Sequence, residues 1–313
     1  MTPQINCNGC PTVLVLLACY NGGAWIRSQL ESILAQQEVD VRVAIRDDGS
    51  SDATLTEIAH FGGDDRVRMA SSSARTGSAA QNFLRLIRDH PADGFEFVAL
   101  ADQDDIWSHD KLARACRKLS ESQSAGYSSA TIAAWPNGRT AVLRQADVMT
   151  AGDFLLEGAG QGCTFVLRAD LYRQVRQFVT AHQSLTGALH YHDWMIYALA
   201  RSWGHSWTFD PSPSVTYRQH AGNDTGARTS VAGIRKRLAR MRRGWYRAQL
   251  TAICAVCAAA GPYNVVVAEW NSLLLANSGW RRKLRMMLFC LRGGRRRVLD
   301  NLIVVFAALA GWI

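Results

Sequence analysis

Residues 95–107, FEFVALADQDDIW, decide how the first part of the chain folds. The stretch opens as a short run of apolar, β-prone residues, which predicts a strand buried on both faces. It ends in three carboxylates, Asp102, Asp104 and Asp105. Such clustered charges need a metal ion, a basic partner or full hydration, and strands of open α/β sheets end at the ligand crevice. The alternative is a solvated loop in which Asp110 caps the next helix.

Two stretches upstream repeat the pattern of an apolar run that ends in polar residues. TVLVLLAC (12–19) is followed by the turn YNGG (20–23), and VRVAIRDDGSSD (41–52) places Asp47 and Asp48 at its end. Helical patterns follow both runs, and a weaker strand lies at 67–71. This alternation predicts an α/β fold with a mostly parallel sheet flanked by helices, whose polar strand ends collect along one edge.

The sequence lacks the phosphate-binding fingerprints of two large enzyme classes. Asn21-Gly22-Gly23 does not match GxGxxG, and no stretch matches GxxxxGK[ST]. A dinucleotide dehydrogenase and a P-loop enzyme are therefore disfavoured. The predicted sheet edge presents carboxylates, rather than glycines, to its ligand.

The segment after residue 120 contributes further candidate pieces. Residues 135–138, WPNG, predict a turn between two short strands. GAGQGCTFVL (158–167) places glycines before a short strand, as expected where the backbone approaches a ligand or another segment closely. HYHDW (190–194) opens a helical stretch, and 206–210 and 214–220 have the pattern of two further short strands.

Five motifs in this order resemble those of the family 2 glycosyltransferases, which have the GT-A fold. They are CYNGG (19–23), RDDGSSDAT (46–54), ADQDDIW (101–107), HDW (192–194) and YRQHAGN (217–223). The wording of the last three is most similar to the rhamnosyltransferase branch. The resemblance implies an inverting enzyme that moves a sugar, rhamnose from dTDP-rhamnose as the first expectation, to a glycan or lipid-linked acceptor in surface polysaccharide synthesis. The alternatives are a UDP- or GDP-linked donor sugar, or a catalytically silent membrane-bound assembly partner.

The resemblance implies donor-binding roles for the first two motifs and for the start of the third. Tyr20 and Asn21 match the loop that lies against the nucleotide base, and Asp47 or Asp48 matches the acid that hydrogen-bonds the base or ribose. Asp102 matches an acid near the ribose. The alternatives are that Tyr20 closes the first turn and that Asp47 and Asp48 are ordinary turn residues.

The resemblance also implies a metal site and a general base. Asp104 matches the acid that holds Mg²⁺ or Mn²⁺ on the diphosphate, and His220 matches a position near the metal or diphosphate; hard cations of this kind need few protein carboxylates. Asp193 matches the base that takes the acceptor's proton, with a helix N-cap as the alternative. Arg218 is expected at the diphosphate or on a local acid. Asp105 is expected at the donor sugar or acceptor, or as support for the loop.

The charge divides the chain into two parts. Residues 1–230 hold 20 Lys+Arg and 24 Asp+Glu, whereas residues 231–313 hold 15 and 2. We therefore expect a GT-A catalytic domain over 1–230 and a basic helical region over 231–313. Seven basic residues at 235–247 and eight at 281–297 alternate with apolar ones at helical spacing. This pattern predicts amphipathic helices, the first with Trp245 as its interfacial aromatic, on an anionic membrane surface.

The final apolar run, 298–313, is shorter than the about 20 residues of a spanning helix, so we expect an interfacial or homo-oligomer-forming helix. A solvated helical face and nucleic-acid binding are alternatives for the basic tail. The acidic catalytic half and the absence of an aromatic stacking pattern argue against nucleic acid. The cysteine pairs Cys7/Cys10 and Cys254/Cys257 lack further ligands at metal-site spacing, which predicts free thiols. Without a secretory signal pattern, the expected location is cytoplasmic, peripheral at the inner face of the cytoplasmic membrane.

Overall fold

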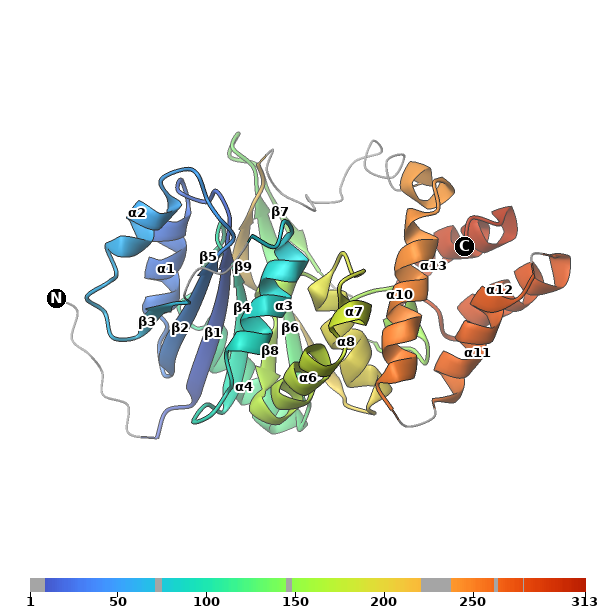
Figure 1. Cartoon of the computed structure of the whole chain (residues 1–313), viewed down its shortest axis with the longest axis horizontal. Coiled ribbons are helices and arrows are strands. Elements are labelled where there is room, and N and C mark those ends of the chain that lie inside the picture. Colours follow the sequence, from blue (N-terminus) through green and yellow to red (C-terminus); the bar gives the residue numbers. More distant parts are fainter. Residues whose placement is uncertain (1–8, 71–74, 145–147, 221–237, 262–263, 278) are drawn as a thin grey trace.

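A computed structural model describes residues 9–70, 75–144, 148–220, 238–261, 264–277 and 279–313, which form one sheet, helices on both faces and a helical C-terminal region (Figure 1). The strands are β1 (Thr12–Cys19), β2 (Asp40–Asp47), β3 (Val67–Met69), β4 (Phe97–Asp102), β5 (Ile106–Trp107), β6 (Gly126–Ala134), β7 (Thr140–Leu143), β8 (Val166–Arg168) and β9 (Trp207–Arg218). The helices beside the sheet are α1 (Ile26–Leu34), α2 (Thr54–Ala59), α3 (Ala79–Asp89), α4 (Lys111–Ser122), α5 (Asp153–Leu156), α6 (Ala169–Ala181), α7 (Gln183–Thr186) and α8 (His192–Ser202), with the 3-10 turn η1 (Gly162–Thr164). The C-terminal helices are α10 (Trp245–Ala259), α11 (Val265–Leu275), α12 (Trp280–Gly293) and α13 (Val298–Ala310).

The first four strands form the parallel half of the sheet, in the order β3-β2-β1-β4. Leu14 and Leu16 of β1 pack into the hydrophobic cluster under α3 and α6, whereas Val13 and Val15 pack into the cluster under α1 and α4. Burial on both faces explains why these strands are continuously apolar and do not alternate with polar residues. The predicted α/β architecture is confirmed in this half.

The other half of the sheet is mixed. β8 runs antiparallel to β4 and β6, β9 runs parallel to β6, and β5 runs antiparallel to β9. β6 and β7 form the predicted hairpin around residues 135–138. The expectation of two short strands within 206–220 is wrong, because β9 is a single strand of 12 residues. Its register against β6 shifts on both sides of Ala130, and this irregularity accommodates Pro211 and Pro213 without ending the strand.

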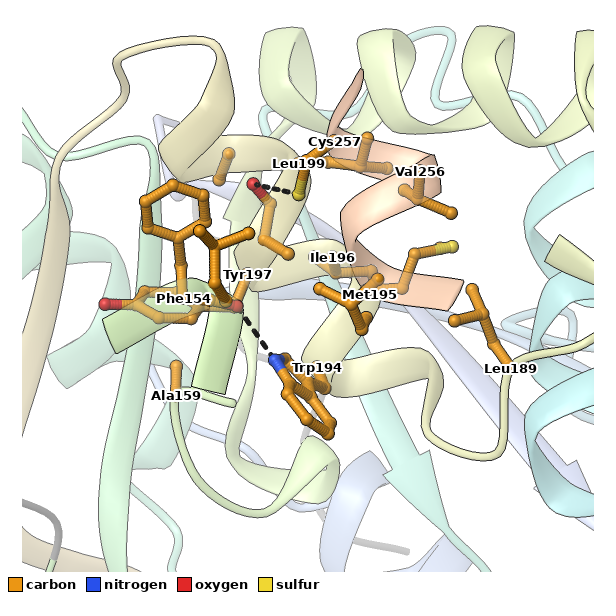
Figure 2. Packing of buried hydrophobic residues seen from close by; sticks show 14 of the residues in the cluster. Phe154, Ala159, Leu189, Trp194, Met195, Ile196, Tyr197, Leu199, Val256 and Cys257 are labelled. Carbon is orange, nitrogen blue, oxygen red and sulfur yellow. Dashed lines mark hydrogen bonds between the residues drawn. The ribbon is translucent and has the colours of Figure 1, made fainter. Parts of the chain in front are cut away.

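The C-terminal helices share a hydrophobic core with the part of the chain that contains the sheet. Val256 and Cys257 of α10 pack beside Ile196 and Leu199 of α8, as Figure 2 shows. The same cluster continues through buried residues of α11, α12 and α13. No helix among the described residues is both long and apolar enough to cross a membrane. The boundary between residues 230 and 231 stays a prediction.

The basic segment 235–247 does not form the expected single amphipathic helix. Residues 235–237 lie outside the described residues, and the helix at 238–242 ends before Gly244, whose φ of +79° interrupts helical geometry. Trp245 is partly buried, with its ring centroid 5.5 Å from that of His190 and 5.9 Å from that of Tyr191. An interfacial role for Trp245 stays a prediction. Cys254 and Cys257 are free thiols, as predicted, and Cys7 lies outside the described residues.

Candidate active site

The acidic strand ends meet at one edge of the sheet. Because β1 pairs in parallel with β2 and β4, Cys19 lies opposite Asp47 and Ala18 lies opposite Asp102. The loops that leave these three strands therefore begin side by side, as predicted. The alternative of a loop capped by Asp110 does not hold, because the side chain of Asp110 makes no capping hydrogen bond to α4.

Gln103, which is not among the predicted site residues, joins the loop after β1 to the acidic loop after β4. Its Oε1 accepts a hydrogen bond from the Tyr20 N–H at 2.7 Å, and its Nε2 donates to the Tyr20 carbonyl at 2.8 Å. Gly22 makes room for it, because a Cβ at Gly22 would lie 2.2 Å from Gln103 Oε1. Tyr20 is 40% exposed, and the Arg75 guanidinium lies 4.4 Å from the centroid of its ring. An exposed ring of this kind is suited to stacking on a planar base.

Asp47 and Asn21 hold the turn after β2. Asp47 Oδ2 accepts hydrogen bonds from the N–H groups of Gly49 and Ser50 at 3.0 and 2.8 Å. Asn21 has a φ of +48°, and its side-chain oxygen accepts from the Ser51 N–H at 2.8 Å. Both side chains therefore act as turn formers, and Asn21 ties the loop after β1 to the loop after β2.

Asp48 is a buried carboxylate that anchors the segment before α3. It accepts hydrogen bonds from Arg46 Nη1 at 3.0 Å and from the N–H groups of Thr76 and Gly77 at 2.6 and 2.8 Å. Burial opposes ionisation, but these hydrogen bonds outweigh it and lower the pKa of Asp48. Asp48 is thus held as a carboxylate inside the loop that it supports.

Asp104 and His220, 116 positions apart in the chain, meet at this edge. Nε2 of His220 lies 2.8 Å from Oδ2 of Asp104, and both side chains are largely buried. The His220 ring stacks on Trp25, with the centroids 4.1 Å apart and the planes 13° from parallel. Trp25 is a further residue absent from the predicted set; it precedes α1 and fixes the plane of the imidazole.

The spacing of Asp104 and His220 suits two neighbouring ligands of an octahedral divalent cation. Two neighbouring ligands of an octahedral Mg²⁺, each at about 2.1 Å, lie about 3 Å apart, and the observed separation is 2.8 Å. A second group, Asp102, Asp105 and Cys163, has its ligand atoms within 4.8 Å of one another. Burial and the nearby carboxylates raise the pKa of the Cys163 thiol, and a thiol is a poor ligand for Mg²⁺. Asp104 and His220 are therefore the better candidate metal ligands.

Asp105 lies inside the protein. It is fully buried, and neither carboxylate oxygen has a hydrogen-bond partner among the described residues. Burial, together with the charges of Asp104 and Asp102, raises the pKa of Asp105 well above its ordinary range. Lys111 is also fully buried, with Nζ 3.7 Å from the centroid of the Trp107 ring, and burial lowers its pKa to about 7. A donor contact by Asp105 stays a prediction.

Asp193 lies in the first turn of α8, where its Oδ1 accepts a hydrogen bond from the Trp194 N–H at 2.7 Å. Gly162 passes close to it, because a Cβ at Gly162 would lie 3.2 Å from Asp193 Cβ. The next residue, Cys163, belongs to the group that contains Asp102. The glycine-containing segment thus makes the close approach predicted for it. It links the first turn of α8 to the acids at the end of β4.

The neighbouring motif residues have supporting positions. His192 stacks on Phe83 with centroids 4.0 Å apart, and burial lowers its pKa to about 3, which leaves a neutral structural ring. Arg218, at the end of β9, donates from both Nη atoms to Ser28 Oγ at 3.1 Å. Tyr217 is buried near the acidic loop, and burial followed by the nearby thiol and carboxylates raises its pKa.

Comparisons with known proteins point in one direction. Residues 11–244 match the family described as "Glycosyltransferase like family 2". The chain is 35% identical over 269 residues to the Shigella flexneri protein named dTDP-rhamnosyl transferase RfbG, an alignment that covers 85% of this chain and 93% of that protein. It is 30% identical over 100 residues to the Escherichia coli protein named UDP-Glc:alpha-D-GlcNAc-diphosphoundecaprenol beta-1,3-glucosyltransferase WfgD, covering 32% of this chain and 38% of that one. The crystal structure of S. aureus TarS 1-349 in complex with UDP-GlcNAc aligns with a TM-score of 0.56 at 14% identity, covering 96% of this chain and 80% of that one, which shows a shared fold.

Proposed function

Because the chain belongs to glycosyltransferase family 2, as its motifs predicted, we propose that it transfers rhamnose from dTDP-rhamnose to a glycan or lipid-linked acceptor, with inversion at the anomeric carbon. The relative named dTDP-rhamnosyl transferase supports this choice of donor. The name of the relative WfgD describes an acceptor on diphosphoundecaprenol, which supports a lipid-linked acceptor here. Surface polysaccharide synthesis is the process in which such a transfer would serve.

The meeting of two acidic loops with the first turn of α8 carries the proposal. A site lined by carboxylates repels a nucleoside diphosphate unless a cation lies between them. Asp104 and His220 are the residues that would hold Mg²⁺ or Mn²⁺. The ion would neutralise the diphosphate and stabilise the charge on the departing nucleotide.

Asp193 is proposed as the general base. The acceptor hydroxyl gives its proton to the Asp193 carboxylate while its oxygen bonds to the anomeric carbon and the bond from that carbon to the diphosphate breaks. A positioned base of this kind contributes about 10²- to 10⁴-fold. The hydrogen bond from the Trp194 N–H at 2.7 Å orients the carboxylate for this step.

The donor is proposed to lie along the loops after β1, β2 and β4. Several side chains of these loops are already buried or hydrogen-bonded within the loops, so substitutions are needed to test whether they also contact the donor. The assignments are Tyr20 and Asn21 at the base, Asp47 or Asp48 at the base or ribose, Asp102 at the ribose, Asp105 near the donor sugar and Arg218 at the diphosphate.

Two substitutions and a ligand screen test this function. Thermal unfolding with dTDP-, UDP- and GDP-sugars in the presence of Mn²⁺ should show the largest stabilisation with dTDP-rhamnose. Asp193→Asn should still bind the donor but turn it over about 10²- to 10⁴-fold more slowly. Asp104→Asn should lose the Mn²⁺ dependence of turnover. A near-normal rate in Asp193→Asn would place the base elsewhere, and unchanged Mn²⁺ dependence in Asp104→Asn would remove the metal role.

We further propose that α12 and α13 rest on an anionic membrane surface, which places the enzyme peripherally at the inner face of the cytoplasmic membrane. Both helices expose apolar residues at spacings of three or four positions, which puts them on one side of each helix. The exposed members are Leu284, Leu288 and Leu291 on α12 and Leu299, Leu302, Phe306 and Leu309 on α13.

The charge beside this apolar face is positive. Of the eight basic residues at 281–297, three are taken up inside the protein: Arg282 donates to the Leu273 carbonyl at 2.7 Å, and Arg295 and Arg296 pair with acids of the catalytic half. The remaining five, with Asp300 as the one acid of residues 280–313, give about 1 kcal/mol each near an anionic surface.

Co-sedimentation with vesicles of phosphatidylglycerol and phosphatidylcholine tests the membrane proposal. The double variant Leu302→Asp, Phe306→Asp should lose vesicle binding. Leu55→Asp, at an exposed apolar position on α2 that is 45% exposed, is the matched control and should retain it. If the α13 variant still sediments with vesicles, or only dissociates a dimer, the apolar face serves something other than lipid.

A further inference from the structure

The turn between α12 and α13 is inserted into the catalytic half of the protein. The side chain of Arg296 is 2% exposed. Its Nη1 lies 2.8 Å from Asp153 Oδ2, its Nη2 donates to the Gly158 carbonyl at 2.6 Å, and its backbone N–H donates to Glu157 Oε1 at 2.6 Å. The Arg296 guanidinium thus binds both ends of the six-residue segment 153–158, which the planar, multi-donor geometry of arginine allows.

Asp153 links Arg296 to α8 through its carboxylate. Its carboxylate is fully buried and accepts from the Tyr197 hydroxyl at 2.6 Å and from Arg201 Nη1 at 2.9 Å, in addition to Arg296. Tyr197 and Arg201 both lie on α8. A buried carboxylate with three donors is held firmly in place, because removing any one of them leaves a buried carboxylate oxygen with one hydrogen bond fewer.

The segment 153–162 is the support on which the first turn of α8 rests. The indole Nε1 of Trp194 donates to the Phe154 carbonyl at 2.8 Å, the bond drawn in Figure 2. Gly158 faces the same residue, because a Cβ there would lie 3.2 Å from Trp194 Cα. Gly162 completes the contact, with its added Cβ 3.2 Å from Asp193 Cβ. The residues that Arg296 holds, 153–158, therefore contact Trp194, and the same stretch of chain continues to Gly162, which lies against Asp193.

We propose that Arg296 is a positioning residue for Asp193, acting from the C-terminal region through the Gly158 carbonyl. The inference rests on the proposed function, in which Asp193 is the base. A misplacement of about 1 Å in a catalytic group costs up to about 100-fold in rate. The C-terminal region would then support the general base in addition to its proposed contact with the membrane.

The experiment compares substitutions that disturb this contact with one that does not. Arg296→Lys keeps the charge but has a single ammonium in place of the two-armed guanidinium, and Gly158→Ala adds a Cβ against Trp194. Arg295→Met is the matched control, because Arg295 lies in the same turn as Arg296. The variant removes the ion pair between Arg295 and Glu157, whose atoms are 3.1 Å apart, and leaves the contacts of Arg296 with Gly158 and Asp153 in place. The readout is dTDP released from dTDP-rhamnose with Mn²⁺ and water as the acceptor, per folded protein.

The expected result is a fall in kcat of about 10- to 100-fold for Arg296→Lys and Gly158→Ala, with the KM for dTDP-rhamnose within about twofold of the parent. Arg295→Met should keep kcat within about twofold while losing thermal stability. An unchanged kcat in folded Arg296→Lys and Gly158→Ala overturns the inference. A parallel change of kcat and KM in all three variants, the control included, also overturns it, because that is the signature of general loosening.

Asp193→Asn in the same assay separates this inference from the function beneath it. If Asp193→Asn keeps its rate, the assignment of the base is wrong. If Asp193→Asn loses its rate while Arg296→Lys and Gly158→Ala keep theirs, the base stands and only the positioning role of Arg296 fails.

Discussion

The contact between Gly22 and Gln103 allows a double-mutant test of the donor-side loops. In Gly22→Ala the new Cβ would lie 2.2 Å from Gln103 Oε1, a separation that real Cβ atoms essentially never show. The Gly22 backbone cannot yield, because its N–H donates to Thr54 Oγ1 at 2.8 Å and its carbonyl accepts from the N–H of Ile26 at 2.9 Å. The Gln103 side chain must therefore move and release Tyr20.

The cost follows from the bonds that are lost. Gln103 makes two hydrogen bonds to the Tyr20 backbone, at 2.7 and 2.8 Å, both in an exposed setting. Each contributes about 0.5–1 kcal/mol, so Gly22→Ala should destabilise the protein by about 1–2 kcal/mol. Gln103→Ala loses the same two bonds and should cost the same. The double variant should cost no more than either single one, because Gln103→Ala removes the side chain with which the new methyl group clashes.

Urea unfolding of the parent, both single variants and the double variant measures this coupling. The expected interaction energy is about 1–2 kcal/mol in the stabilising direction. A donor titration should show weaker binding in all three variants to a similar degree, because Tyr20 loses the same support in each. Free energies that add within about 0.3 kcal/mol would refute the reasoning, since independent sites behave in that way.

Three further predictions concern charges and rings around the site. Asp48→Asn should lower the free energy of unfolding near pH 7 and make that free energy fall less steeply in acid. The pKa of Asp48 is lower in the folded than in the unfolded protein, so the carboxylate stabilises the fold above the unfolded pKa of about 4. This stabilisation is lost as the pH falls through the folded pKa. Urea unfolding at several pH values measures this, and an unchanged acid limb would contradict it. Lys111→Met should raise stability near pH 7 by on the order of 1 kcal/mol, because it removes a buried amine that has no hydrogen-bond partner among the described residues. Between the folded pKa of Lys111, about 7, and its usual value, Lys111 is protonated in the unfolded chain but not in the folded one, so the stability of the parent protein should rise with pH in that window. If Lys111→Met shows the same rise, Lys111 is not its source. Trp25→Ala should raise the Mn²⁺ concentration for half-maximal turnover several-fold, because His220 loses the ring that fixes its plane, whereas Trp25→Phe should largely restore it; equal values in the two variants would argue against the stack.

The strand ends could be predicted from the sequence because their signal is local. An apolar run followed by acids marks Asp47 and Asp102 without any knowledge of partners, and parallel pairing then puts them on one edge. Gln103 and Trp25 carry no such signal. Their positions depend on how the loops close on one another, through backbone bonds to Tyr20 and through a ring stack on His220, and neither contact leaves a periodic pattern.

The basic residues of the C-terminal region also show that contacts between distant residues cannot be predicted from the sequence. A run of basic residues at 281–297 predicts a positive surface, but a linear sequence does not show which of them meet acids elsewhere. Arg296 pairs with Asp153, 143 positions away, and becomes part of the interior. The amphipathic helix α12 and the apolar helix α13 were predictable because helical spacing and apolar runs are again local properties.

The carboxylates of the site divide by how much of their bonding capacity the loops already use. A carboxylate offers about four acceptor positions. Asp48 has hydrogen bonds from Arg46, Thr76 and Gly77, and two N–H groups of its own turn bind Asp47 Oδ2, so both are largely committed to loop structure. Asp104 is different, because its bonded partner is His220, a side chain that can join it as a ligand of the same ion. His220 can give up its hydrogen bond to Asp104 when both side chains bind the same cation. Of these three carboxylates, Asp104 is therefore the one whose substitution should cause the largest loss of donor turnover for the smallest loss of stability.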